Sequence, residues 1–268
     1  MISKTLDKKK MYFEVLGNLN SSKTIIFLNG LSQSTVSWGL VTPYFIEEYK
    51  IILCDFIFQG QSDKDSPVRD FDTHAVDVLT ILDTLGIEKA TLIGLSYGSL
   101  VAQHFSVLYP DRIDKMVLLS TFANKTPYYE AIELSWKNAL EIGGYSLMLD
   151  VMLPYVLSDV YFSKPLIPIE FFKSAKKDVV DATSLTKLMQ ATAERKDFRE
   201  SLQKVKCKTL VIHGRLDGLF PVYLGQEVAN QIKNSKFTII ENAGHTLNIE
   251  EVNKVSTTIL VFLNEPIE

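Results

Sequence analysis

The chain has 268 residues, 46% of them hydrophobic, and its formal net charge is −4 at pH 7. This length and composition suit one large globular core, and the mild acidity disfavours a nucleic-acid partner. The N-terminus is polar and rich in lysine, and no apolar run reaches the length of a membrane-spanning helix. We therefore expect a cytoplasmic location, a small-molecule substrate and no membrane partner.

The residues that usually hold disulfides and metals are few and scattered. The two cysteines, Cys54 and Cys207, are too few for a disulfide framework. The four histidines do not combine with them in a zinc-ligand spacing. No glycine-rich phosphate loop is present either, so we expect no metal, nucleotide or organic cofactor. The sequence leaves the oligomeric state open.

Short apolar runs alternate with helical stretches along most of the chain. The predicted strands cover 24–28, 51–54, 90–95, 115–119, 209–213 and 237–240. The predicted helices cover 71–85, 97–108 and 248–263. Runs that are apolar throughout are typical of strands buried on both faces, and strands that alternate with helices form parallel sheets. The order predicts an α/β fold with a mostly parallel central sheet and helices on both faces.

The alternation stops between 122 and 205. This segment has no convincing buried strand and is rich in aromatic residues such as Trp136, and the sheet pattern resumes at Cys207. The helices there either complete the core or form a cap over the carboxyl edge of the sheet, and we favour the cap. We therefore predict a core built from 1–121 and 206–268, with a helical cap at 122–205 that lines a mostly apolar pocket.

The sequence Gly94-Leu95-Ser96-Tyr97-Gly98 joins a predicted buried strand to a predicted helix. A G-x-S-x-G motif in this context presents a serine on a tight turn that needs small flanking residues. Ser96 is therefore the candidate nucleophile. So short a pattern also recurs by chance, and taken alone Ser96 could be only a small residue between two glycines.

Two residues further along the chain favour the catalytic interpretation. His245 lies in a turn-rich stretch after the last predicted strand and is the candidate base for Ser96. Asp217 follows the preceding predicted strand and is the candidate carboxylate that orients His245. Either could by itself be an ordinary loop residue. The order serine, aspartate, histidine, each just after a strand, predicts a catalytic triad. The remaining histidines, His74, His104 and His213, are expected to be structural.

Backbone N–H groups are the candidate oxyanion donors. The N–H of Tyr97 lies at the N-terminus of a predicted helix, where a developing negative charge is stabilised. The N–H of Leu31 lies in the loop after the strand at 24–28 and is the second candidate. We expect the substrate to contact Asn29, Trp136 and Leu219.

With these residues in place, the chain resembles the α/β-hydrolase superfamily over nearly its whole length. The resemblance rests on G-L-S-Y-G, H-G-R-L-D-G-L-F-P and N-A-G-H. Within the superfamily the chain is similar to small capped hydrolases such as 3-oxoadipate enol-lactonases and carboxylesterases. The segment 55–62 resembles the family's D-x-x-G-x-G-x-S loop, with Phe58 in place of the first glycine. This loop and Asn29-Gly30 also resemble the hydroxyacyl transferase of rhamnolipid synthesis.

The resemblance implies an α/β-hydrolase fold and a serine hydrolase that acts through an acyl-enzyme on Ser96. The expected substrate is a carboxylic ester, lactone or thioester of a small, largely apolar molecule. Two alternatives stay open, an acyltransferase that takes a β-hydroxyacyl group from a thioester donor and a ligand-binding sensor on the same fold. A serine at this position disfavours the dehalogenases and epoxide hydrolases of the fold, which use an aspartate there.

Overall fold

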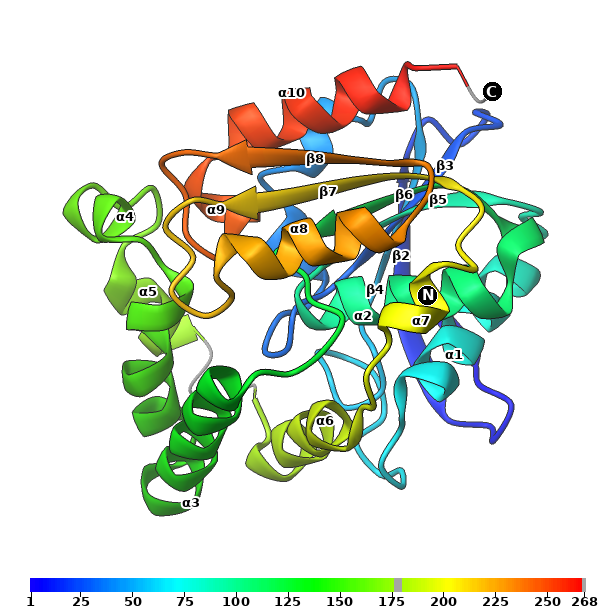
Figure 1. Cartoon of the computed structure of the whole chain (residues 1–268). Coiled ribbons are helices and arrows are strands. Elements are labelled where there is room, and N and C mark those ends of the chain that lie inside the picture. The colour runs from blue at the N-terminus through cyan, green and yellow to red at the C-terminus, as the bar shows by residue number, and fades with distance from the viewer. Residues whose placement is uncertain (176–179, 267–268) are drawn as a thin grey trace.

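The computed structural model describes residues 1–175 and 180–266, and these contain one eight-stranded sheet (Figure 1). The strands are β1 (Ile2–Lys4), β2 (Lys10–Gly17), β3 (Thr24–Leu28), β4 (Lys50–Cys54), β5 (Ala90–Leu95), β6 (Ile113–Leu119), β7 (Lys208–Gly214) and β8 (Ser235–Ile240). Their order across the sheet is β1-β2-β4-β3-β5-β6-β7-β8. Every pairing from β4 to β8 is parallel, while β1 and β2 are antiparallel to their neighbours. The predicted α/β fold with a mostly parallel sheet is confirmed.

The predicted strands agree closely with the observed ones. The ranges 24–28 and 90–95 coincide with β3 and β5, and the other four strands start one or two residues earlier than predicted. Alternate side chains of each central strand enter two separate cores, as the twofold repeat of a strand requires. In β3, for example, Ile26 and Leu28 belong to one core, while Ile25 and Phe27 belong to the other.

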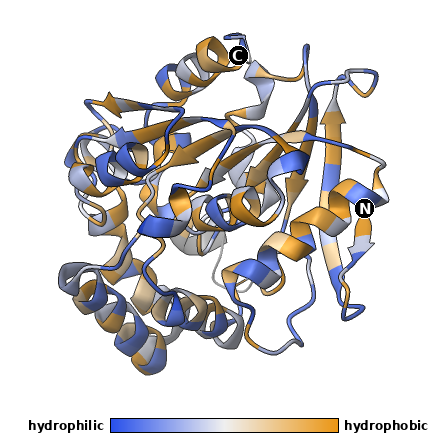
Figure 2. Cartoon of the chain, turned by 45° about the vertical axis from the view of Figure 1, so that its right-hand side comes forward, coloured by the Kyte–Doolittle hydropathy of each residue, from blue (hydrophilic) through white to orange (hydrophobic). Residues whose placement is uncertain are grey.

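Helices cover both faces of this sheet. The helices are α1 (Phe71–Thr84), α2 (Tyr97–Leu108), α3 (Pro127–Val156), α4 (Asp159–Ser163), α5 (Ile169–Ala175), α6 (Ala182–Glu194), α7 (Arg199–Leu202), α8 (Val222–Gln231), α9 (Leu247–Glu250) and α10 (Val252–Leu263). Buried residues of α1, α2 and α8 join the core that contains Ile26, and those of α10 join the core that contains Ile25. Figure 2 shows hydrophobic residues running along the central strands between these layers.

The structure differs from the sequence predictions in four elements. The strands β1 and β2 were not predicted, because lysines conceal the buried Met11 and Phe13 of β2. The helix α8 was also missed. The predicted helix 248–263 is two helices that break at Glu251. The carboxylate of Glu250 at this break accepts backbone hydrogen bonds from Ser158 and Gly244, which fixes the local chain direction.

The segment between β6 and β7 contains helices and no strand among its described residues. Helices α3 to α6 lie together at one side of the layered core (Figure 1). The long α3 bends at Gly144, whose φ of 67° is outside the helical region. Buried side chains from α3 and α6 join the core on the α2 side of the sheet, so the segment is packed onto the rest of the protein.

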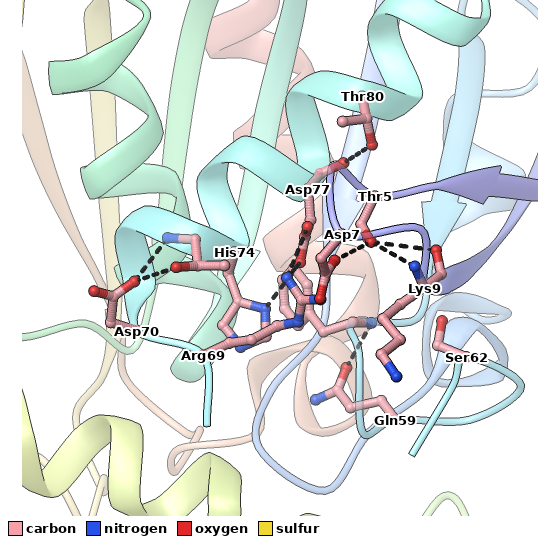
Figure 3. A network of polar contacts seen from close by, with 12 residues as sticks. Thr5, Asp7, Lys9, Gln59, Ser62, Arg69, Asp70, His74, Asp77 and Thr80 are labelled. Atoms are coloured by element: carbon pink, nitrogen blue, oxygen red, sulfur yellow. Dashed lines mark hydrogen bonds and ion pairs between the residues drawn. The ribbon is translucent and has the colours of Figure 1, made fainter. Parts of the chain in front are cut away.

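A buried ion-pair network ties the turn after β1 to helix α1 (Figure 3). The guanidinium of Arg69 contacts both carboxylate oxygens of Asp77 at 3.0 and 3.1 Å and both of Asp7 at 2.7 Å. The His74 ring lies beside it, with Nδ1 4.0 Å from the Asp77 carboxylate. Arg69 and Asp77 are almost completely buried, so each depends on the other for compensation of its charge.

No helix within residues 1–175 and 180–266 is both long and apolar enough to cross a membrane. A cytoplasmic location stays a prediction.

Candidate active site

Ser96 lies on the tight turn between β5 and α2, as the motif predicts. Its φ of 51° and ψ of −113° are unfavourable for a residue with a side chain. The backbones around it are packed so closely that neither flanking glycine could carry a Cβ. A Cβ at Gly94 would lie 2.4 Å from the carbonyl oxygen of Gly98, and a Cβ at Gly98 would lie 2.2 Å from that of Leu28. The two glycines therefore allow the turn that exposes Ser96 to the cavity.

The structure brings Asp217 and His245 together from the loops after β7 and β8. The His245 Nδ1 atom lies 2.9 Å from Oδ2 of Asp217. The other carboxylate oxygen accepts the backbone N–H groups of Leu219 and Phe220 at 2.9 and 2.8 Å, so the carboxylate is held from both sides. The ring of Phe220 packs edge-on against His245, with 5.0 Å between the ring centres. These contacts fix the imidazole in one orientation.

The electrostatics around Asp217 favour its ionised form. Burial alone would raise the pKa of this carboxyl, but the His245 ring and hydrogen bonds from His213 and His245 hold the pKa well below its usual range. The Nε2 atom of His213 lies 2.7 Å from the Phe220 carbonyl oxygen and 3.3 Å from Asp217. His213 thus has a structural role, as predicted. It also helps to keep the Asp217 carboxylate ionised.

Ser96 and His245 line the same cavity, which has a volume of about 700 Å³. Most of its wall is apolar and comes from the helical segment and the loops around Ser96. The residues of α3 and α6 that line it are Tyr129, Trp136, Tyr145, Leu149, Met152, Leu153, Val156, Leu185, Leu188 and Thr192. A cavity of this size and character suits a small organic molecule with few polar groups.

The candidate oxyanion donors, Leu31 and Tyr97, both lie at the cavity wall. Leu31 belongs to the loop after β3, and Tyr97 follows the turn after β5. Tyr97 is the first residue of α2, and the N–H groups of a helix's first turn have no acceptor within the helix. On the opposite loop, the side-chain amide of Gln59 donates to the carbonyl oxygens of Gly30 and Leu31 at 2.9 and 3.1 Å. The Gly30 carbonyl oxygen also accepts the backbone N–H of Gln33 at 3.2 Å. In a trans peptide the Gly30 carbonyl and the Leu31 N–H point in opposite directions, so these two donors together hold the direction of that N–H.

The three predicted substrate-binding residues lie in two different places. Trp136 and Leu219 line the cavity. Asn29 is completely buried outside the cavity lining, so the expectation that it contacts the substrate is wrong. Its amide nitrogen donates to the carbonyl oxygen of Cys54 at 2.8 Å, and its amide oxygen accepts the indole N–H of Trp38 at 2.9 Å. Asn29 therefore supports the loop that carries Leu31.

Sequence reasoning gave no role to Gln59 or Glu133. Gln59 belongs to the 55–62 loop, where the resemblance to a family motif drew attention to the glycine positions rather than to the side chain between them. Glu133 lies in α3 and accepts a hydrogen bond from the hydroxyl of Tyr129, which lines the cavity. Glutamate in an amphipathic helix usually faces water, so no local pattern marks this one as buried.

We expect Glu133→Gln to change the pH dependence of stability. Burial raises the pKa of Glu133 to about 7 from an ordinary value of 4.5, so the folded state keeps this proton longer than the unfolded state does. Wild-type stability should therefore fall as the pH rises from about 4.5 to about 7 because Glu133 ionises inside the protein. The glutamine variant lacks this loss, and its advantage over wild type should grow by up to about 3 kcal/mol between pH 5 and pH 8.5.

Urea unfolding at both pH values measures this effect. The matched control is Glu141→Gln on the exposed side of the same helix, where the side chain is 63% accessible and no such difference is expected. An equal shift of the Glu133 variant at pH 5 and pH 8.5 would contradict the prediction.

Comparisons with known proteins point to the same fold as the structure does. A sequence model of the alpha/beta hydrolase fold matches residues 23–140. The AB hydrolase superfamily protein YisY of Bacillus subtilis is 28% identical over 277 residues, which cover 97% of this chain and 98% of that protein. The 3-oxoadipate enol-lactonase 2 of Acinetobacter baylyi is 26% identical over 85% of this chain and 83% of its own length.

Solved structures show the same fold. The alpha/beta hydrolase enzyme MGS-M2 from a Medee basin deep-sea metagenome library has a TM-score of 0.89 and 25% identity, and the match covers 100% of this chain and 98% of that one. A thermophilic esterase from Thermogutta terrifontis has a TM-score of 0.86 at 23% identity over 98% of this chain and 97% of the esterase.

The chain has the α/β-hydrolase fold, as its sheet order, the match to the fold's sequence model over residues 23–140 and these similar proteins agree. It is an enzyme of this fold, in line with relatives that are named as an AB hydrolase superfamily protein and an enol-lactonase.

Proposed function

We propose that this chain is a serine hydrolase that cleaves a carboxylic ester, lactone or thioester through an acyl-enzyme on Ser96. The observation that carries the proposal is the 2.9 Å contact between Asp217 and His245 at a cavity that Ser96 also lines. A hydroxyl on a strained turn, an imidazole held by a buried carboxylate and a nearby helix N-terminus are the parts that acyl transfer needs.

In the proposed mechanism, the Nδ1–H of His245 donates to Asp217, which leaves Nε2 free to accept a proton. His245 takes the hydroxyl proton of Ser96 as the serine oxygen attacks the carbonyl carbon. The N–H groups of Leu31 and Tyr97 stabilise the oxyanion, and His245 returns the proton to the leaving group. Water then attacks the acyl-enzyme by the same route, with His245 again as base, and releases the acid.

We further propose that 122–205 acts as a cap that selects a small, largely apolar substrate. Its helices supply most of the apolar wall, including Trp136, and Leu219 contributes from the loop after β7. Burial of apolar substrate surface against this wall would contribute about 25 cal/mol for each Å² removed from water. Similar chains are named as an enol-lactonase and a putative carbamate hydrolase, and these names support a substrate with a carbonyl group that a nucleophile can attack.

Covalent labelling tests the proposal directly. We expect a fluorophosphonate probe to label the protein at Ser96, and a panel of p-nitrophenyl esters, lactones and acyl thioesters to contain substrates that are turned over repeatedly. Mass analysis of the products separates hydrolysis from acyl transfer, because hydrolysis gives the free acid and transfer gives an ester of a second molecule. Labelling at another residue, with no turnover on the panel, would overturn the proposal.

A further inference from the structure

A buried chain of hydrogen bonds connects the end of α6 to the turn that carries Ser96. It starts at Arg195, which directly follows α6 in the sequence. We call the side chains of Gln103, Thr121 and Ser99 the relay. The guanidinium Nη2 of Arg195 donates to the amide oxygen of Gln103 at 2.7 Å, and the amide nitrogen of Gln103 donates to the Thr121 hydroxyl at 2.7 Å. All three relay side chains have less than 1% of their surface accessible.

The last member of the relay contacts the peptide that follows Ser96. The Ser99 hydroxyl lies 2.5 Å from the Ser96 carbonyl oxygen and 2.8 Å from the Thr121 hydroxyl oxygen. It has one hydrogen to donate. The Ser96 carbonyl oxygen also accepts the backbone N–H groups of Ser99 and Leu100 at 2.9 and 3.3 Å. The contact with the Ser99 hydroxyl is the shortest of the three, and it joins this carbonyl to the relay.

This contact bears on the oxyanion hole because of peptide geometry. The Ser96 carbonyl and the Tyr97 N–H belong to one planar trans peptide, in which they point in opposite directions. A hydrogen bond that fixes the carbonyl therefore fixes the N–H as well. Rigid placement of such a donor is what gives an oxyanion hole its catalytic effect, since the donor need not reorganise during the reaction.

Arg195 is built into the protein as a buried cation. Its guanidinium lies 4.9 Å from the ring centre of Phe198 and 5.6 Å from those of Phe71 and Phe122. Burial lowers its pKa to about 9, which leaves it charged at neutral pH. It also donates to the carbonyl oxygen of Ala123 at 2.9 Å. Its Nε also donates to Nε2 of His104 at 3.2 Å, and Nδ1 of that ring lies 2.6 Å from the Asp72 carboxylate, so the guanidinium reaches a carboxylate only through His104. A buried charge without a carboxylate in direct contact is costly.

We propose that Arg195 is a positioning residue that acts through the relay to hold the Tyr97 N–H toward the cavity. The proposal rests on the proposed function, because Tyr97 matters only if an oxyanion forms at Ser96. It links the helical segment to the chemistry: docking of the end of α6 onto α2 is coupled to the geometry of the oxyanion hole. No substrate contact by Arg195 is required, and Arg195 is not among the residues that line the cavity.

Interrupting the relay at two points tests this role. Thr121→Val removes the middle hydroxyl with little change in shape, and Arg195→Met removes the cation. Each should lower kcat for p-nitrophenyl butyrate about tenfold, a fraction of the effect of losing a whole oxyanion donor, and leave KM within about twofold. Each should weaken the inhibitor benzeneboronic acid, which forms a tetrahedral adduct with serine, by the same factor of about ten.

The pattern among the variants distinguishes positioning from general destabilisation. Thr121→Ser, which keeps the hydroxyl, should restore kcat to near the wild-type value. The double variant of Thr121 and Arg195 should be no slower than the slower single variant, because both interrupt one path. The control is Thr209→Val in β7, where the buried hydroxyl donates to the Cys207 carbonyl and no change in kcat is expected.

Each outcome decides between the proposals. Wild-type kcat and inhibitor affinity in Thr121→Val would overturn the relay even if Arg195→Met does not fold. A fall in kcat with unchanged inhibitor affinity would also overturn it. If the wild type itself neither hydrolyses the ester panel nor binds the boronic acid at Ser96, the proposed function fails, and the relay proposal with it.

Discussion

Ser96→Ala should lower kcat for any ester substrate by on the order of 10⁴-fold or more while the protein keeps its fold. The variant loses the atom that forms the acyl-enzyme, and its residual activity would come only from binding and the oxyanion donors. Alanine keeps the Cβ of serine, so the substitution adds no strain to the turn at φ 51° and should not lower stability appreciably. Steady-state kinetics and circular dichroism of the same preparation check both parts.

The control for this variant is Ser256→Ala in α10. The Ser256 hydroxyl is buried and has no hydrogen-bond partner among the described residues, and Ser256 does not line the cavity. Its removal should leave kcat unchanged. Wild-type turnover in Ser96→Ala would eliminate the acyl-enzyme mechanism, whatever the control shows.

The same experiment can test whether Ser96 and His245 act together. If His245 serves only to activate Ser96, then His245→Ala should cost about as much as Ser96→Ala, and the double variant should be no slower than either single one. Independent, additive losses would instead indicate that the two residues serve separate reactions. The measurement is the fall in kcat of all three variants on one ester.

The fold could be predicted from the sequence because its central strands are buried on both faces. Such strands read as unbroken apolar runs, and β3 and β5 were located to the residue. The strands β1 and β2 escaped prediction because β1 lies at the edge of the sheet and β2 beside it, and their partly exposed positions carry lysine and glutamate. β2 pairs with β4, which is distant in sequence, so the neighbours of β2 along the chain do not mark it as a strand.

Some residues of the candidate site could likewise be predicted from the sequence, and others could not. Ser96, Asp217 and His245 could be proposed because each follows a predicted strand, and parallel strands bring their carboxyl ends to one edge. Asn29 was misplaced because nothing in its neighbours along the chain shows which way an amide side chain turns. The contact between Arg195 and Gln103 could not be predicted, because the two residues are 92 positions apart and meet only in the folded protein.

Arg69→Met should lower the free energy of unfolding by about 3–5 kcal/mol, since it leaves the buried carboxylate of Asp77 without its partner. The loss should be larger at pH 8 than at pH 5. Burial raises the pKa of Asp77 to about 7 and Arg69 opposes that rise, so the carboxyl is protonated below this pH and needs the cation less. Above it, the wild type holds an ion pair, and the variant must bury a lone charge or take up a proton.

Two further variants show whether the charge of Asp77 is the cause. Asp7→Asn removes the half-exposed partner of Arg69, whose side chain is 48% accessible, and should cost less than about 1 kcal/mol. Arg69→Met/Asp77→Leu removes both buried charges and should recover most of the lost stability, because a buried ion pair can often be replaced by apolar side chains. Urea unfolding at pH 5 and pH 8 measures all of these. A double variant as unstable as Arg69→Met would show that the loss came from packing of the arginine side chain and not from the unpaired carboxylate.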